Sequence, residues 1–434
     1  MKNCFLVIGA LCFFVFHADA HNSQLKASVA SVDITPPIEM KYTLGGYGER
    51  MNKPAEAIHD RIWAKALVLE KDNRKYAIIT LDLLGLPANV KQDLLKRISS
   101  LGWNADNMML LPSHSHGSLE MSALNSKNLL GSPQIGIFQP ELLDFLLNKL
   151  EALVIAADQN YQPVKIGTAS KTIDGLNRNR RKDPEVDKEM IVTRVDLENG
   201  KPLAVLVNWT AHPTFIGGKD MLVSAEWPGY LQTELQNRIG NGVTVMYYNG
   251  SEGDQSPILN EPGDAYKNIE VYGQKIAGIA FEEFKGIKTK NNKAFDYSYR
   301  VIKLPARVAH PSFMKTGGSE YGLNEGTVKV ILEMMCPTEV GIGAVRIGDL
   351  IIAGVPGEMT AVLGMKIKSS LEKGSADKVA IGGLANEWIS YILSRNQYEH
   401  GEGYESSVSF YGAGLGDLIS DEVIKTALPI TGTK

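Results

Sequence analysis

The chain has 434 residues, of which 44% are hydrophobic and 22% charged, as in an ordinary globular protein. Its 45 basic and 49 acidic residues give a formal net charge of −4, so no basic excess points to a nucleic acid partner. The length alone allows two or three domains, but length is a weak guide to domain number.

The first 20 residues have the pattern of a secretory signal peptide. Lys2 supplies a positive charge, residues 4–16 are almost uninterruptedly apolar, and residues 18–20 form an A-x-A cleavage site. The apolar run is too short to span a bilayer comfortably, and no later segment reaches the ~20 apolar residues required. We therefore predict a cleaved signal peptide, export to the periplasm or beyond the cell, and no stable membrane span; an uncleaved anchor is the alternative. Cleavage would leave Cys336 as the single cysteine, which we expect to be a packed residue.

Apolar segments of strand length alternate with amphipathic segments of helical period along the rest of the chain. The predicted strands are 62–70, 75–83, 108–111, 191–197, 203–209, 243–248, 345–353 and 378–382. The predicted helices are 88–101, 140–157, 228–239 and 265–284. This alternation predicts an α/β fold, with a mixed or parallel sheet and flanking helices, in a single domain over residues 21–434.

Polar side chains follow four of these apolar segments, at the point where each segment ends. Segment 108–111 leads into His114 and His116, segment 203–209 into His212, segment 243–248 into the loop 249–257, and segment 351–355 into Glu358. In open α/β sheets, binding sites form beyond the carboxyl ends of the strands. The sequence therefore predicts a site, with a metal ion, at these strand ends.

The His114-Ser115-His116 triplet is an indication of a metal because residues i and i+2 of an extended segment point the same way. Zinc accepts imidazole nitrogen and carboxylate oxygen, and a catalytic zinc site keeps one position open. Taken alone, the triplet equally describes two hydrogen-bonded loop histidines. His212 alone equally describes a packed residue, and the loop 249–257, whose glycines allow Ser256 to be presented for attack, equally describes a turn.

Nine short motifs, taken in order, carry a resemblance to a known family. They are Asp33-Ile34-Thr35-Pro36-Pro37, Gly45-Gly46-Tyr47-Gly48, His114-Ser115-His116, Asn177-Arg178, Asp187-Lys188-Glu189-Met190, Ala211-His212-Pro213, Gly253-Asp254-Gln255-Ser256-Pro257, Val355-Pro356-Gly357-Glu358, and Gly383-Leu384-Ala385-Asn386 continuing to Tyr391. In this order they resemble the neutral (non-lysosomal) ceramidase family. Each motif is weak by itself, whereas the ordered set is specific and covers nearly the whole mature chain.

The resemblance implies a set of site residues. The implied ligands of one Zn²⁺ per chain are His114, His212, Glu358 and Tyr391. The residues implied to face the substrate or take part in the reaction are His116, Arg178 and Ser256, with Tyr398 and Tyr404 lining the site. The chemistry of these side chains suits a catalytic metal site. Two imidazoles and one carboxylate leave a bound metal ion cationic, so that it can polarise a carbonyl group or lower the pKa of bound water.

The sequence also departs from the family pattern. It reads H-S-H-G where the family usually has H-T-H-S, it is shorter after Asn177-Arg178, and it ends soon after Tyr411, where family members continue into a C-terminal β-sandwich. We therefore expect a catalytic domain without that sandwich. We also expect a shallower pocket that handles short or soluble N-acyl substrates at least as well as long-chain ceramide.

The predicted function is zinc-dependent hydrolysis of an N-acyl amide, most simply of ceramide (N-acylsphingosine) to sphingosine and a fatty acid. The partner is then a small-molecule or lipid amide. Two alternatives stay open: an esterase or amidase with the same metal centre and a non-ceramide substrate, and an inactive exported binding protein that keeps the fold. Acyl-chain length, oligomeric state, and whether serine or water attacks first also stay open.

Overall fold

The largest element of the structure is an eight-stranded sheet with the strand order β11-β9-β8-β6-β1-β3-β4-β5. The structure is a computed structural model that describes residues 24–240, 242–259, 264–291, 294–373, 377–400 and 403–432, so the predicted signal peptide lies outside the described residues. The strands of this sheet are β1 (Lys26–Asp33), β3 (Trp63–Lys71), β4 (Arg74–Leu81), β5 (Met108–Pro112), β6 (Gln162–Thr172), β8 (Glu189–Leu197), β9 (Pro202–Trp209) and β11 (Thr244–Asn249).

Parallel pairs stand at both ends of this sheet. β4 pairs with β5, and β9 with β11, in parallel, whereas the pairs between them are antiparallel. β11, at one end of the strand order, also lies against β4 and β5 at the other end, and Lys65 on β3 donates a hydrogen bond to the carbonyl of Val245 on β11 (2.8 Å). The sheet therefore curls back on itself.

A second sheet has four strands in the order β13-β14-β15-β17. They are β13 (Phe295–Lys303), β14 (Glu339–Ile347), β15 (Leu350–Gly354) and β17 (Lys378–Gly382), with only β15 and β17 parallel. The prediction of one strand over 345–353 is wrong. Gly348 has a φ of 62°, which favours glycine, and the chain turns there to form the β14–β15 hairpin. The mixed α/β fold itself is confirmed.

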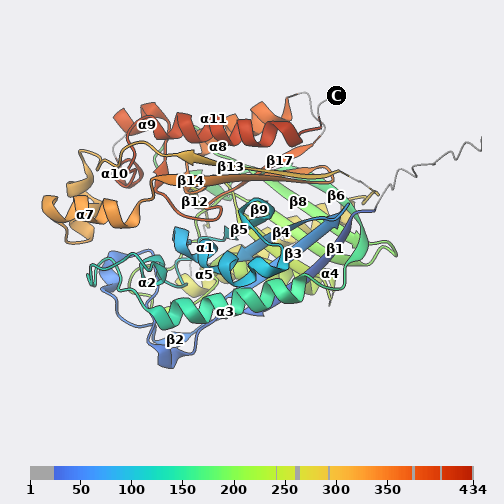
Figure 1. Ribbon diagram of the computed structural model, residues 1–434, viewed down its shortest axis with the longest axis horizontal. Helices are drawn as coiled ribbons and strands as arrows, with labels where there is room; N and C mark the ends of the chain where they lie inside the picture. The colour runs from blue at the N-terminus through green and yellow to red at the C-terminus, as the bar shows by residue number, and fades with distance from the viewer. Residues whose placement is uncertain are drawn as a thin grey trace, which may run out of the picture.

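Helices cover the outer faces of both sheets (Figure 1). On the large sheet these are α1 (Ala88–Ile98), α3 (Pro140–Ala157), α4 (Glu226–Ile239) and α5 (Ala265–Gly286); on the small sheet they are α8 (Ala361–Glu372) and α11 (Leu415–Ala427). In Figure 1, α3 lies at the bottom and α11 at the top, with the strands between them. One buried cluster joins side chains of both sheets, including Leu67, Ile78 and Ile352. The layers are thus helix, sheet, sheet and helix.

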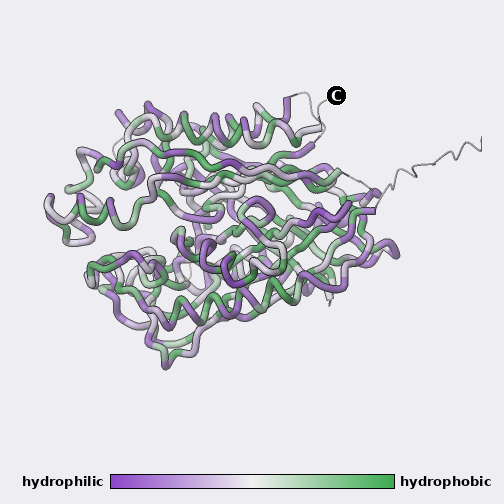
Figure 2. The backbone as a smooth tube through the Cα atoms, viewed as in Figure 1, coloured by the Kyte–Doolittle hydropathy of each residue, from purple (hydrophilic) through white to green (hydrophobic). Residues whose placement is uncertain are grey.

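The helices are amphipathic, as this arrangement requires. The buried side chains of α3 include Leu143, Leu146, Leu150 and Leu153, which recur every three or four residues. Figure 2 shows hydrophobic and hydrophilic residues alternating along α3 and α11. Among the described residues, no helix combines the length and the apolar character needed to cross a bilayer.

Two short sheets stand near the ends of the long strands. Glu358 and Tyr391 face each other across the parallel pair β16 (Glu358–Met359) and β18 (Tyr391–Ile392). Ser256 and Arg178 are register partners in the antiparallel pair β12 (Gln255–Pro257) and β7 (Asn177–Asn179). These pairs fix the backbone segments that carry four of the predicted site residues.

Ile352 tests the layer between the two sheets. Its side chain is fully buried there, so Ile352→Ala should lower the free energy of unfolding by about 2–5 kcal/mol through lost apolar burial and a cavity. The measurement is urea denaturation. Val301→Ala, on β13 and 58% exposed, is the control and should change stability little. Equal effects of the two substitutions would contradict the layer assignment.

Candidate metal centre and active site

His114 stands just beyond β5 in a strained backbone conformation. Its φ of 71° lies in the left-handed region, where a residue with a Cβ atom is uncommon. The conformation is held by two hydrogen bonds: the His114 N–H donates to the carbonyl of Leu83 (2.9 Å), and Nδ1 donates to the carbonyl of Leu84 (2.6 Å). Strain of this kind is retained at functional sites.

His212, beyond β9, is held in the same way. Its Nδ1 donates to the carbonyl of Glu252 (2.7 Å), in the loop that follows β11. Because carbonyl oxygens only accept, both His114 and His212 carry their proton on Nδ1, and each turns the lone pair of Nε2 inward. Burial, reinforced by the charge of Arg180, lowers the pKa of His212 to about 4, so this imidazole is neutral at neutral pH.

The two Nε2 atoms converge on one carboxylate oxygen. Glu358 Oε2 lies 3.3 Å from Nε2 of His114 and 3.1 Å from Nε2 of His212. The other oxygen, Oε1, accepts a hydrogen bond from the indole N–H of Trp388 (2.8 Å). Burial raises the pKa of Glu358, whereas the two imidazoles in their protonated form would hold it well below its ordinary value. Three buried groups from different loops thus turn electron pairs toward one point.

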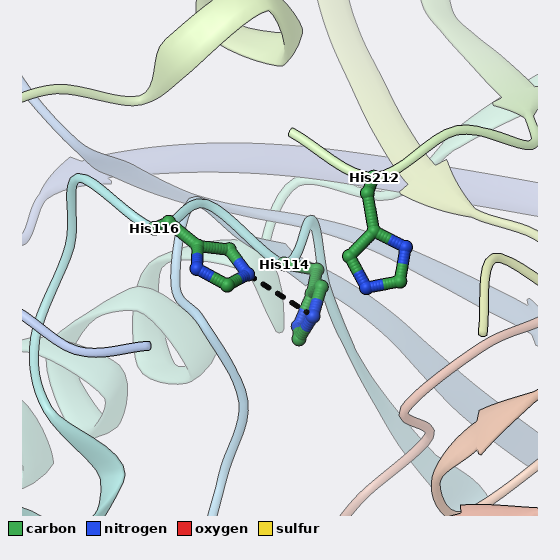
Figure 3. Close-up of side chains that lie close together, drawn as sticks. All are labelled: His114, His116 and His212. Atoms are coloured by element: carbon green, nitrogen blue, oxygen red, sulfur yellow. Dashed lines mark hydrogen bonds between the residues drawn. The ribbon is translucent and has the colours of Figure 1, made fainter. Parts of the chain in front are cut away.

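His116 completes a cluster of three imidazoles. His114, His116 and His212 are all buried, and their candidate ligand atoms lie within 4.8 Å of one another. Figure 3 shows His114 between the other two, with the contact between His116 Nε2 and His114 Nε2 (3.4 Å) dashed. Burial, followed by the neighbouring histidines, holds the pKa of His116 well below its ordinary value. Its Nδ1 is buried without a hydrogen-bond partner in the described part of the chain.

This donor set fits a metal ion. Neutral imidazole nitrogens whose other nitrogen donates to a backbone carbonyl, together with an oriented carboxylate, form the usual surroundings of a bound metal. Electron pairs facing one another in a buried space are unfavourable unless a cation or a shared proton lies between them. The buried imidazole cluster is therefore a candidate metal site, with Glu358 as its carboxylate.

Two further residues hold His116 in place. Gly46 has a φ of 91°, and a Cβ atom there would lie 2.2 Å from Nδ1 of His116, so this position requires glycine. The guanidinium of Arg50, 2% exposed, donates to the carbonyl of His116 (2.7 Å) and to the carbonyls of Gly45, Gly217 and Asp220. Arg50 therefore ties together three loops around His116.

Tyr391 lies beside Glu358 and is contacted by an arginine. Arg180 donates to the Tyr391 hydroxyl (3.0 Å) and to the carbonyl of Gly253 (2.9 Å), and its Nε is paired with Glu405 (2.5 Å). Burial, then the charge of Glu358, hold the pKa of the Tyr391 phenol well above its ordinary value. The phenol is thus a neutral group of fixed orientation beside the imidazoles.

A cavity of about 980 Å³ opens onto this centre. Its polar wall includes His114, His116, His212, Glu358 and Tyr391, and Tyr404 also lines it. Its apolar wall is formed by Leu84, Leu86, Pro87, Met121, Ile135, Phe313, Leu323, Ile331, Leu332, Met335, Cys336, Trp388, Val408 and Phe410. The volume is at the upper end of the usual range for ligand sites.

Three predicted site residues lie elsewhere. Among the described residues that line the cavity, Ser256, Arg178 and Tyr398 are absent. Ser256 is half-buried in β12 and Arg178 is exposed in β7. Tyr398 packs against His310 instead, with ring centres 4.7 Å apart.

Arg180, two residues after the predicted Arg178, lines the cavity together with Arg181. The chain repeats the same dipeptide, Asn177-Arg178 and then Asn179-Arg180, and the motif alone does not distinguish the two copies. Sequence reasoning also did not assign roles to Tyr47, Arg50 and Trp388. Tyr47 lies in the motif Gly45–Gly48, and Trp388 lies in the segment from Gly383 to Tyr391. Their place in these motifs was the one sequence signal for a role in the site.

Comparison with known proteins identifies the family. Residues 26–268 and 319–416 match the family described as neutral/alkaline non-lysosomal ceramidase, N-terminal. The chain belongs to this family. It is 24% identical to the neutral ceramidase of Pseudomonas aeruginosa over 85% of this chain and 66% of that protein. It is 22% identical to the neutral ceramidase of Drosophila melanogaster over 94% of this chain and 74% of that protein.

A solved structure, entitled "Ceramidase complexed with C2", shares the fold. It has a TM-score of 0.81 and 20% sequence identity, over 94% of this chain and 75% of that one. The chain therefore spans about two thirds to three quarters of the length of these ceramidases.

His212→Ala tests the metal centre. Loss of one imidazole should empty the site, because His114 and Glu358 are then the only two left of the three proposed ligands. The measurement is metal content by elemental analysis after dialysis. Ser256→Ala, whose hydroxyl lies outside the cavity lining, is the control and should keep its metal. Full occupancy in His212→Ala would rule out the assignment.

Arg50→Met tests the support of His116. The substitution removes the guanidinium donor from four carbonyl groups, those of Gly45 and His116 being buried, so both stability and the position of His116 should suffer, while His114 and His212 keep their own hydrogen bonds. We expect metal to be retained and turnover to fall by about 10²-fold, the effect of misplacing a group by ~1 Å. Arg61→Met, which removes a mostly exposed ion pair with Asp33, is the control. Unchanged turnover in Arg50→Met would contradict the role.

Proposed function

We propose that this protein is an exported, zinc-dependent amidohydrolase that cleaves the N-acyl bond of a lipid amide such as ceramide. One observation carries the proposal: Nε2 of His114 and of His212 converge on Oε2 of Glu358 at the polar wall of a large apolar cavity. Membership of the ceramidase family supports the amide as the bond, and the sequence pattern of residues 1–20 supports export.

Zinc suits the donor set, because it prefers imidazole nitrogen and carboxylate oxygen in sites that keep one position open. His114, His212 and Glu358 would hold it, with Tyr391 as the fourth candidate ligand. A bound zinc ion supplies Lewis acidity, which polarises a carbonyl group and makes water a better nucleophile at neutral pH.

The residues of the chain itself orient the substrate. His116 is neutral and lies beside the two metal-ligating imidazoles, so it offers one N–H and one lone pair to the polar part of a bound amide. The guanidinium of Arg180 is held by its ion pair with Glu405 and donates a hydrogen bond to the Tyr391 hydroxyl. It also places a positive charge in the same wall of the cavity. We assign to Arg180 the substrate-facing role that the motif suggested for Arg178.

The apolar wall suits an aliphatic chain. Each methylene group removed from water contributes about 0.8 kcal/mol, so a cavity lined by side chains such as Leu332, Trp388 and Phe410 favours lipid amides over small polar ones. Such binding also excludes water from the polar wall, where interactions between charges are then stronger.

Glu358→Gln tests the function. The neutral amide cannot balance the charge of a metal, so hydrolysis of N-acylsphingosine by the purified enzyme should fall by at least about 10²-fold. The measurement is release of fatty acid and sphingosine, identified by mass spectrometry. Glu234→Gln, a surface substitution on α4, is the control and should leave turnover unchanged.

Other outcomes separate the alternatives. Release of fatty acid only from a matched ester would make the protein an esterase, and no turnover of either bond by the metal-loaded protein would make it a binding protein. Ser256→Ala belongs in the same series. Its position outside the cavity lining predicts turnover near that of the wild type, whereas a loss of about 10²-fold would show that the serine takes part directly.

A further inference from the structure

A second cavity, of about 370 Å³, lies behind one wall of the cavity that contains the metal centre. The two cavities share three lining residues, Asn125, Met335 and Cys336. Asn125 follows the short helix α2 (Met121–Leu124), whereas Met335 is the last residue of α7 (Glu325–Met335). These three side chains, here called the partition, separate the cavities.

The partition is formed by side chains from two distant segments of the chain. Asn125 Nδ2 donates to the sulfur of Met335 (3.3 Å), and Asn125 Oδ1 accepts from the backbone N–H of Lys127 (3.0 Å). Cys336 is buried, which raises the pKa of its thiol to about 12 and keeps it neutral. Asn125 is thus fixed by its own loop, while Met335 is a flexible, apolar side chain.

The metal-side face of the partition is reached along apolar surface. The indole N–H of Trp388 donates a hydrogen bond to Glu358. The ring centre of Trp388 lies 6.4 Å from the ring centre of Phe410. Phe410 lies 5.5 Å from Phe313, and both belong to the same buried cluster as Cys336. An aliphatic chain that starts at the metal centre therefore has continuous apolar contact up to the partition.

Beyond the partition the surroundings are polar. The second cavity is lined by Asn89, Arg307, Glu333 and Glu387, among others. Asn89 Oδ1 is buried without a hydrogen-bond partner in the described part of the chain. A hydrocarbon chain that entered this cavity would displace water from groups that it cannot hydrogen-bond, which costs free energy.

We infer that the partition sets the longest acyl chain that the site accepts, and that Met335 is the residue that determines this specificity. The inference rests on the proposed function for the assignment of the cavity to a lipid amide. Affinity for a saturated chain should rise about fourfold with each added methylene, until the chain end meets Met335. Longer chains should then gain nothing or lose affinity.

The experiment compares chain-length profiles of the metal-loaded protein and its variants. One assay measures kcat/KM for N-acylsphingosines with saturated acyl chains of increasing length. A second measures binding of free fatty acids of the same lengths by quenching of tryptophan fluorescence, for which Trp388 is a reporter inside the cavity. Trp388→Phe identifies the part of the signal that comes from the cavity.

Met335→Ala removes three heavy atoms from the partition, and a longer chain can fill the space that they leave without entering the polar cavity. The break, which is the chain length at which each profile stops rising, should therefore move to longer chains, with a gain of about tenfold for chains just beyond the wild-type limit. Met335→Leu conserves the bulk and should keep the wild-type limit. Ile331→Ala is the matched control, because Ile331 lines only the metal-side cavity among the described residues. Asn125→Ala opens the partition from its other side and should act like Met335→Ala.

The outcomes separate the inference from the proposed function. An unchanged break in folded Met335→Ala and Asn125→Ala, or an equal shift in Ile331→Ala, would overturn the inference. Absence of amide turnover, with a break in fatty acid binding that moves in Met335→Ala, would reject the proposed function and support the partition. A break that moves in both assays supports both.

Discussion

The structure of the site depends on one interaction, the approach of two imidazole lone pairs to one buried carboxylate oxygen. His114 and His212 each donate a hydrogen bond from Nδ1–H to a backbone carbonyl. Neither imidazole can carry its proton on Nε2 instead, and donate it to Glu358, without losing that bond. Trp388 binds the other carboxylate oxygen and fixes Glu358 as well. The unfavourable convergence of these groups is tolerable because a cation can relieve it. The strained backbone of His114 is explained in the same way, since surrounding contacts must hold a ligand in place before the metal binds.

The fold brings together loops that the strand order alone would keep apart. In the antiparallel order from β4 to β9, the carboxyl ends of β5 and β9 would fall on opposite edges of a flat sheet. In the structure β11 lies against β4 and β5, and the loops after β5 and β9 meet at Glu358. The rule that sites form at strand ends thus led to the right histidines, although the geometry differs from an open sheet. The curl could not be predicted from sequence, because it depends on the short pairing of β1 with β6 and on packing against the second sheet.

Residues in strand-end loops were predictable, whereas those selected by register or packing were not. His114, His212 and Glu358 follow apolar strands directly, and the structure brings them together. Arg178 and Arg180 stand in identical dipeptides, and only the pairing of β7 with β12 turns Arg178 outward. The apolar wall from Phe313 to Cys336 carries no motif at all, so its contribution to the cavity could not be predicted from the sequence. Likewise, Gly348 lies within an apolar run whose composition hides the hairpin turn.

Trp388 links the polar and the apolar walls, and this link bears on catalysis. Its N–H orients a candidate metal ligand, and its ring begins the apolar path that continues through Phe410. A chain packed against that ring restricts the same side chain that fixes Glu358. Binding free energy from a remote, unreactive part of a substrate can be used to orient the reacting groups, and then it appears in kcat as well as in KM. Under the proposed function, chain length and reaction rate would therefore be coupled through one tryptophan, rather than being independent properties of two ends of a cavity.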